Sequence, residues 1–115
     1  MDNKVKHYQK IISETLKRYA ALPSEGNVED ELEDQLILDT ERNHFQILTV
    51  GWEKGKRVYY PVFHLDIKNG KIWIQEDATD FDVVGELEQQ GVPSEDIVLA
   101  FHAPFKRPLT GYAVA

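Results

Sequence analysis

At 115 residues the chain has the length of one ordinary domain, and 42% apolar residues are enough for a core of that size. The absence of cysteine excludes thiolate metal sites, thiol nucleophiles and disulfides. The formal net charge of −7 opposes unassisted nucleic-acid binding, because DNA affinity depends on Lys and Arg neutralising phosphates. The charged N-terminus is unlike a signal peptide and no apolar run reaches about 20 residues, so we expect a cytoplasmic protein without a membrane span.

The charges are unevenly spread. Residues 1–22 carry five basic and two acidic residues, whereas residues 24–41 carry eight acidic residues and no basic one. The acidic stretch is either a solvated connector or a docking surface for a basic partner.

The first predicted element is an amphipathic helix that Asp2 or Asn3 caps and that Pro23 stops after Leu22. Its apolar stripe recurs at three- or four-residue steps and should lie on a sheet. The stripe consists of Val5, Tyr8, Ile11, Ile12, Thr15, Leu16 and Tyr19.

From Gln35 the apolar period changes to two, which predicts four strands in an antiparallel meander joined by short turns. Asn69-Gly70 is the strongest hairpin signal, because a type I′ turn needs positive φ at both central residues. The predicted strands are 35–40, 44–52, 57–68 and 71–76.

The turns also predict the register. Asn69-Gly70 would place Ile67 opposite Ile72 and Leu65 opposite Ile74, and Lys54-Gly55 would place Val50 opposite Tyr59. The predicted core face is then Leu48, Val50, Tyr59, Phe63, Leu65, Ile67, Ile72 and Ile74.

The opposite face of that sheet is predicted to be apolar as well, which is unusual for a freely solvated face. A second element or another chain should therefore cover it. The candidate partner face is Phe45, Ile47, Tyr60, Val62, His64 and Trp73, beside Val58, Asp66 and Gln75.

A second helix is predicted after the meander, with Thr79 as its cap, Asp82 at its third position and Gly91 at its end. Residues 97–102 read as a fifth strand, and the tail should be irregular but packed through Phe105, Leu109 and Tyr112. The predicted fold is a single two-layer α+β domain over residues 1–115: helix, four-stranded meander, helix, final strand.

Histidines and carboxylates are the better candidates for chemistry. His64 and Asp66 should project from one face of a strand, as should Asp39 and Glu41, and His44 and His102 could approach in space. Such groups could serve a metal-dependent nuclease, but no ligand-spacing motif is present. A hydrogen-bonded His64 on a covered sheet face is the preferred interpretation, with no catalytic residue, cofactor or metal predicted.

The doublet Lys106-Arg107 follows Phe105 and is a weak candidate for nucleic-acid contact. Two charges are too few for strong DNA binding, where about six to ten phosphate contacts are typical. A salt bridge from Arg107 to the acidic surface is the preferred interpretation.

Several stretches carry a resemblance to a known family: YQKIISETLKRYA, LILDTERNHFQILTVGW, RVYYPVFHLDIKNGKIWIQEDATD and GVPSEDIVLAFHAPFKR. The most specific pieces are DTERNHFQ, HLDIKNGKIWIQ and PSEDIVLAFHAP. In order and spacing they are similar to the XisI family, the fdxN element excision controlling factors of cyanobacteria. The acidic residues 24–34 carry the least of this likeness.

The resemblance implies a controlling factor that works with a companion, XisH, and a serine-type site-specific recombinase to excise an element interrupting a nitrogen-fixation gene. XisH-like proteins resemble endonuclease-fold proteins, and the two families are often encoded side by side. The resemblance supplies no catalytic motif. We therefore expect a non-enzymatic factor that binds an XisH-like partner and forms a homo-oligomer. The alternatives are a direct DNA-binding excision factor and a metal-dependent nuclease.

Overall fold

The computed structural model describes residues 3–22 and 31–115, so Asp2, Pro23 and residues 24–30 of the predicted acidic stretch lie outside the described residues. In chain order the elements are α1 (Asn3–Ala20), β1 (Glu31–Asp39), β2 (His44–Glu53), β3 (Lys56–Lys68), β4 (Lys71–Asp77), α2 (Val83–Gln89), η1 (Ser94–Asp96), β5 (Ile97–Leu99) and η2 (Pro104–Leu109). Within the described ranges no helix is both long and apolar enough to cross a membrane.

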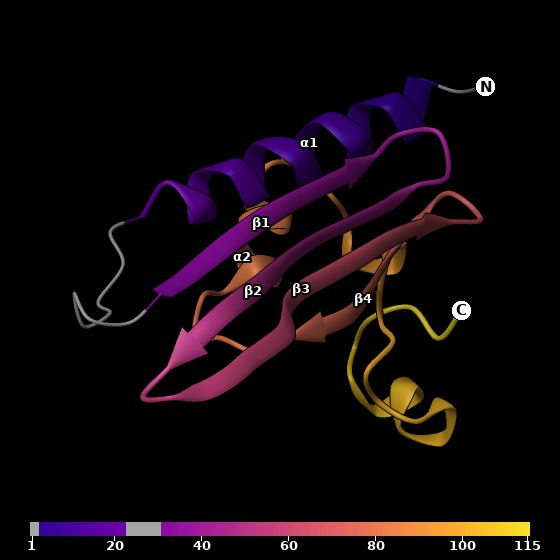
Figure 1. Cartoon of the computed structure of the whole chain (residues 1–115). Helices are drawn as coiled ribbons and strands as arrows, with labels where there is room; N and C mark the ends of the chain where they lie inside the picture. The colour runs from indigo at the N-terminus through magenta and orange to yellow at the C-terminus, as the bar shows by residue number, and fades with distance from the viewer. Residues whose placement is uncertain (1–2, 23–30) are drawn as a thin grey trace.

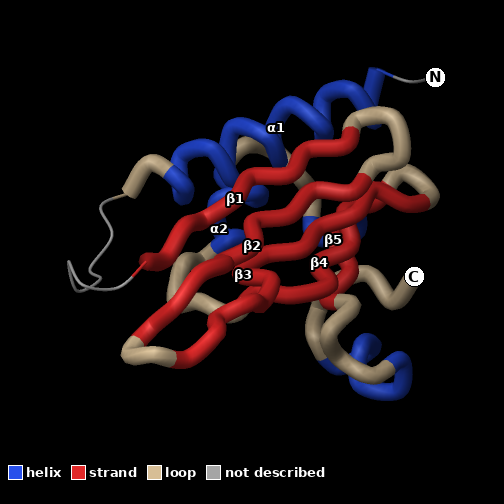
Figure 2. Tube along the Cα trace, in the orientation of Figure 1, coloured by secondary structure: helices blue, strands red, loops and turns tan. Residues whose placement is uncertain are grey.

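The strands form one mixed sheet in the order β1-β2-β3-β4-β5. The predicted meander of β1 to β4 is confirmed, and β5 adds a fifth strand parallel to β4. Figures 1 and 2 show α1 and α2 on the same side of the sheet. One hydrophobic core lies between these two layers, so the predicted two-layer α+β class is correct.

The helix α1 buries the predicted stripe, including Tyr8, Ile12 and Leu16, and leaves its basic residues exposed. At its C-terminal end the Tyr19 ring packs edge-on against Phe63 and Phe81, at centroid distances of 4.8 and 5.4 Å. Such edge-to-face pairs add to the stabilisation from apolar burial, so they fix this end of α1 over the sheet.

Both predicted hairpin turns are confirmed. Asn69 and Gly70 have φ values of 55° and 74°, as a type I′ turn requires, and Lys54 and Gly55 are also positive. The register follows, because Ile67 pairs with Ile72 and Val50 pairs with Tyr59.

A β-bulge in β3 corrects the predicted faces. Between the pairs Ile47–Phe63 and Leu48–Pro61 the register shifts by one residue, so Val62 has no Cα partner on β2. Because neighbouring residues of a strand face opposite ways, the shift exchanges the faces of half the hairpin.

The prediction that Phe45, Ile47 and Val62 lie on the second face is therefore wrong. All three are buried in the core beneath the helices, at 0, 0 and 3% exposure. Tyr60 pairs with the buried Thr49 and also lies on the helical side, where it remains exposed.

Leu48, Val50 and Tyr59, by contrast, were expected in the core. All three lie instead on the face away from the helices. Leu48 pairs with Gln35, and Val50 pairs with Glu33 on one side and with the exposed Tyr59 on the other. The core assignment of Phe63, Leu65, Ile67, Ile72 and Ile74 is correct.

The remaining element boundaries differ at three places. The strand β1 begins at Glu31 rather than Gln35, which places acidic residues on an edge strand. Asp82, rather than Thr79, caps α2 by accepting a hydrogen bond from the Gly85 amide at 3.0 Å, and the helix ends before Gly91 as predicted. The strand β5 stops at Leu99, short of the predicted His102.

Tyr8 and Asp96 join α1 to η1. The Tyr8 hydroxyl donates to Asp96 Oδ2 at 2.5 Å, and Lys4 Nζ lies 2.8 Å from the same oxygen. Burial raises the pKa of Asp96, but the hydrogen bonds from Lys4 and Tyr8 outweigh burial and hold the pKa below its usual range.

We expect Asp96→Asn to lower the unfolding free energy at pH 7 by about 1–3 kcal/mol, because a charged hydrogen-bond acceptor is removed. The folded pKa is depressed, so the carboxylate's contribution is fully present above the unfolded pKa of 3.8 and is lost as pH falls through the folded value. Urea unfolding of both proteins between pH 7 and pH 2.5 should show the difference shrinking below about pH 4. A difference independent of pH would contradict this account.

Gly51 lets β1 approach β2 closely. Its φ is 140°, and a Cβ there would lie 1.8 Å from the Glu31 carbonyl oxygen. We expect Gly51→Ala to lower the unfolding free energy by about 2–4 kcal/mol through the clash and the backbone strain together.

Gly55→Ala is the matched control, since Gly55 also has positive φ but no atom within 4 Å of an added Cβ. Gly55→Ala should lower the unfolding free energy by only about 1–2 kcal/mol, because it introduces backbone strain without a clash. Urea unfolding of both variants measures the difference, and equal losses would contradict a specific role for Gly51.

Candidate functional site: the open face of the sheet

The candidate site is the sheet face away from α1 and α2, which we call the open face. Cross-strand pairing places on it, from the β2–β3 turn onward, the pairs Trp52–Arg57, Val50–Tyr59, Leu48–Pro61, Gln46–His64 and His44–Asp66. The face therefore changes from aromatic and apolar at one end to histidine and carboxylate at the other.

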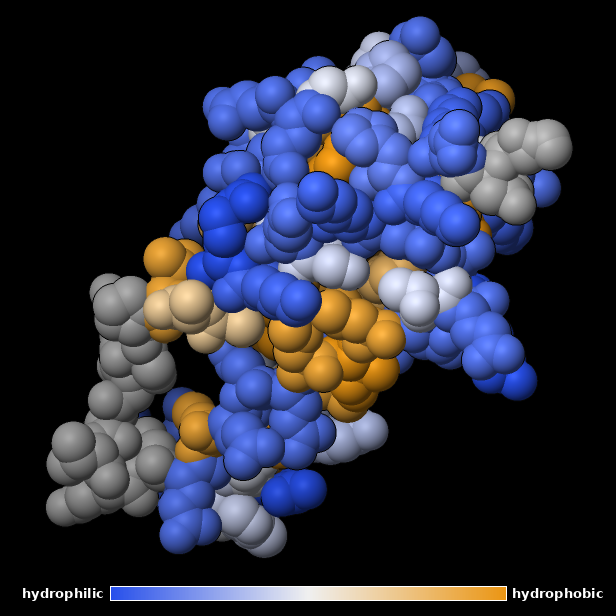
Figure 3. Space-filling view, turned by 90° about the horizontal axis from the view of Figure 1, so that it is seen from above, coloured by the Kyte–Doolittle hydropathy of each residue, from blue (hydrophilic) through white to orange (hydrophobic). Residues whose placement is uncertain are grey.

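The apolar end of the open face is exposed. Tyr59 and Trp52 are 65 and 49% exposed, which is high for side chains of this size. Ile37, which pairs with Gln46 nearer the polar end, is 38% exposed. Arg57 lies beside Trp52, with its guanidinium carbon 5.8 Å from the ring centroid. Figure 3 views the molecule from above, where α1 and β1 lie, and shows a patch of hydrophobic residues between hydrophilic surfaces.

The adjacent edge strand β1 adds negative charge to this face. Glu31, Glu33 and Asp39 pair with Trp52, Val50 and His44, so they share the open face. A shallow hollow there is lined by Glu31, Leu32, Glu33, Gln35, Val50, Gly51, Trp52 and Arg57.

The C-terminal segment covers the β4–β5 end of the same face. Trp73 is only 7% exposed and Val98 is fully buried, and Ala113 forms a β-bridge with Val98. Trp73 lies under two cations, with Lys68 Nζ 4.2 Å and the Arg107 guanidinium carbon 5.5 Å from its ring centroid. Trp73, a predicted partner contact, is thus buried by its own chain.

Arg107 fixes this segment through backbone carbonyls. Its guanidinium donates to the carbonyl oxygens of His102, Ala100 and Val114 at 3.0, 3.3 and 3.4 Å. The predicted salt bridge to an acidic side chain is not found among the described residues. The neighbouring Lys106 is exposed, with its amine 5.9 Å from the exposed Phe105 ring.

The predicted packing of the tail is only partly correct. Tyr112 packs against the core and its hydroxyl donates to Glu88 at 2.8 Å. Phe105 and Leu109 are 76 and 85% exposed, because η2 projects away from the sheet, as Figure 1 shows.

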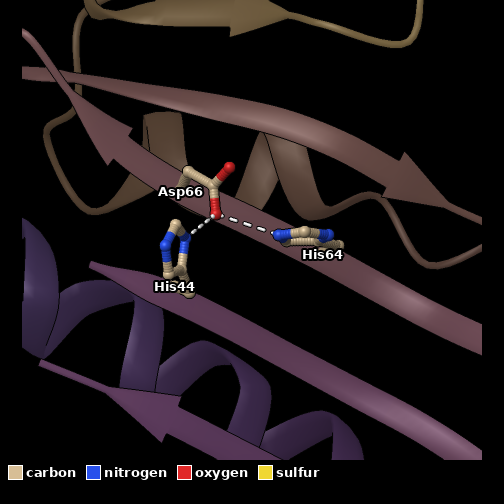
Figure 4. A group of neighbouring side chains, drawn as sticks. All are labelled: His44, His64 and Asp66. Atoms are coloured by element: carbon tan, nitrogen blue, oxygen red, sulfur yellow. Dashed lines mark hydrogen bonds and ion pairs between the residues drawn. The ribbon is translucent and has the colours of Figure 1, made fainter. Parts of the chain in front are cut away.

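Three candidate ligand residues meet at the polar end of the open face. His44 Nδ1 and His64 Nε2 lie 2.8 and 2.9 Å from the same atom, Asp66 Oδ1 (Figure 4). The two imidazole rings are nearly perpendicular, at 80°. The side chains of His44, His64 and Asp66 are 52, 32 and 14% exposed, so the group is open to solvent.

Other groups hold this cluster in place. A second bulge leaves Gln75 of β4 without a Cα partner on β3, and its amide donates to Asp66 Oδ2 at 3.2 Å. Asp39, opposite His44, accepts hydrogen bonds from the amides of Arg42 and Glu41, which lower the pKa of Asp39.

The predicted pairing of His64 with Asp66 on one face is confirmed, and His44 joins them. His102 lies instead in the C-terminal segment, its ring 4.6 Å from Phe101, and Glu41 lies in the turn after β1. Cross-strand pairing could have placed His44 beside Asp66, but only in a register that includes the bulge at Val62, which the sequence analysis did not predict.

The fold and this face define a class, the small two-layer α+β proteins whose five-stranded mixed sheet carries helices on one side. Two solved structures from Anabaena variabilis ATCC 29413 share the fold. One, described as the fdxN element excision controlling factor XisI, is 42% identical with a TM-score of 0.86. The other, described as a XisI-like protein, is 49% identical with a TM-score of 0.87. Each alignment covers 98% of this chain and all of the other.

The family model described as XisI protein matches residues 1–114. The chain belongs to the XisI family. The comparison with curated proteins gives no match. The family match and the two solved structures confirm the resemblance to the XisI family that the sequence analysis identified.

We expect Arg107→Gln to lower the unfolding free energy by about 1–3 kcal/mol, because carbonyls at the β5 end lose a charged donor. Lys106→Gln is the matched control and should change it by less than about 0.5 kcal/mol, since Lys106 is exposed. Urea unfolding followed by circular dichroism measures both. Equal effects of the two substitutions would show that Arg107 does not hold the segment.

Proposed function

We propose that this protein is a non-enzymatic controlling factor for excision of a DNA element, and that it acts by binding an XisH-like protein through the open face. The observation that carries the proposal is the exposed aromatic pair of Trp52 and Tyr59 on a sheet face that the helices do not cover. Contiguous exposed apolar surface of this kind is typical of protein–protein contacts.

The chemistry of the face favours a partner that is both apolar and basic. Trp and Tyr are enriched in the energetic centres of interfaces, and Arg57 beside Trp52 adds a third residue type common there. Glu31, Glu33 and Asp39 form an acidic border along β1. A protein with an endonuclease-like fold presents basic groups to DNA, so an acidic border suits an XisH-like partner.

Membership of the XisI family supports the controlling role, since the solved relative is described as an excision controlling factor. Direct DNA binding gains less support. The net charge is −7, and Arg107 is committed to backbone carbonyls rather than free to meet phosphate.

The experiment compares neighbouring tyrosines. Tyr59→Glu and Trp52→Glu should each weaken binding to the XisH-like protein of the same genome by at least about 30-fold, measured by isothermal titration calorimetry. Tyr60→Glu is the matched control, because Tyr60 is also exposed but lies on the helical side of the same strand. Trp73→Glu would be a poor test, since Trp73 is buried by the C-terminal segment.

Three results would overturn parts of the proposal. Binding that survives Tyr59→Glu but not Tyr60→Glu would move the contact to the helical side. No binding to the XisH-like protein, together with self-association by light scattering that Tyr59→Glu abolishes, would assign the face to a second copy of the chain. Tight DNA binding by the isolated chain, lost with Lys106→Ala, would favour the direct DNA-binding function instead.

A further inference from the structure

We infer that His44, His64 and Asp66 form a binding site for a divalent transition-metal ion of the zinc class. Nothing in the proposed partner contact requires this site, because the aromatic pair lies at the other end of the open face. The inference rests on donor geometry, support from neighbouring side chains, and donor chemistry.

The donor geometry is close to that of a metal centre. The three ligand atoms lie within 4.8 Å of one another, and the two imidazole nitrogens lie 2.8 and 2.9 Å from Asp66 Oδ1. Ligand atoms at about 2.0–2.2 Å from a tetrahedral zinc ion are about 3.3 Å apart. Small side-chain rotations would therefore open space for the ion, whose bonds to the three ligand atoms would take the place of the present hydrogen bonds.

The scaffold holds these donors on rigid elements. His64 and Asp66 are two residues apart on β3, and His44 is the direct cross-strand partner of Asp66 on β2. The Gln75 amide donates to Asp66 Oδ2, which leaves Oδ1 directed at the two imidazoles. Hydrogen bonds of this kind orient carboxylate ligands and typically matter for metal affinity.

The donor set selects the class of ion. Two imidazoles and one carboxylate suit zinc and neighbouring transition metals, whereas magnesium and calcium favour oxygen ligands alone. His44 is half exposed and His64 is a third exposed, so an ion has a path from solvent and further coordination positions remain open. Asp39 opposite His44 adds negative charge beside the site.

The test uses the untagged full chain and Zn²⁺ alone, followed by isothermal titration calorimetry. Wild type should bind one ion per chain with micromolar or tighter affinity. The double variant His44→Ala/His64→Ala should bind Zn²⁺ more than about 100-fold more weakly than wild type, and Gln75→Ala should bind it about 10–100-fold more weakly. Mg²⁺ should give no saturable binding under the same conditions.

The chain offers a matched control, because its four histidines divide into two pairs. The double variant His7→Ala/His102→Ala removes the two histidines outside the cluster and should keep the affinity of wild type. Equal losses in the two double variants, or weak binding by wild type, would overturn the site and leave the cluster as a hydrogen-bonded trio.

A second measurement does not depend on a variant folding. In wild type, Zn²⁺ should shift the imidazole NMR resonances of His44 and His64 and leave those of His7 and His102 unchanged. Shifts of similar size in all four histidines would show nonspecific binding and would also overturn the site.

Discussion

The single extra residue at Val62 in β3 determines what each face of this sheet contains. Both ends of the β2–β3 hairpin are constrained, one by the Lys54-Gly55 turn and the other by the packing of Phe45 and Leu65 beneath α1. Without a bulge these two constraints conflict, because alternate residues of a strand face opposite ways. The bulge satisfies both by exchanging faces halfway along the strand.

The same shift assembles the polar cluster. In the register of the turn, His44 would pair with Leu65 and lie on the core side. In the observed register it pairs with Asp66 and lies beside His64 on the open face. The constraint that places Phe45 and Ile47 in the core therefore also gathers His44, His64 and Asp66 outside it.

Much of the fold was predictable from local signals. The stripe of α1 and the turns at Asn69-Gly70 and Lys54-Gly55 depend on nearby residues, and the structure agrees with each. The predicted faces of β2 and part of β3 failed, because a bulge depends on long-range packing and leaves no turn residue in the sequence.

Two further errors share a physical cause. Glu31 and Glu33 read as connector, because charged residues are depleted in strands, yet an edge strand exposed to solvent accommodates them. Trp73 read as partner surface, because sequence alone could not place Arg107 and the tail over it. In both cases the residue type was read correctly, and its environment depended on long-range arrangement: the place of β1 at the edge of the sheet for the two glutamates, and the covering tail for Trp73.

The open face is consequently covered by the chain in one part and exposed to solvent in another. At β4 and β5 the chain covers it, since Arg107 binds three carbonyls and Trp73 and Val98 are buried. At the β2–β3 turn the chain leaves Trp52 and Tyr59 exposed, although covering one aromatic side chain would stabilise the fold by about 1.5–3 kcal/mol. The C-terminal segment shows that this fold can cover apolar surface on the open face, since it buries Trp73 and Val98. The exposed half therefore supports the proposed contact with another molecule, since exposed apolar patches are typical of such contacts.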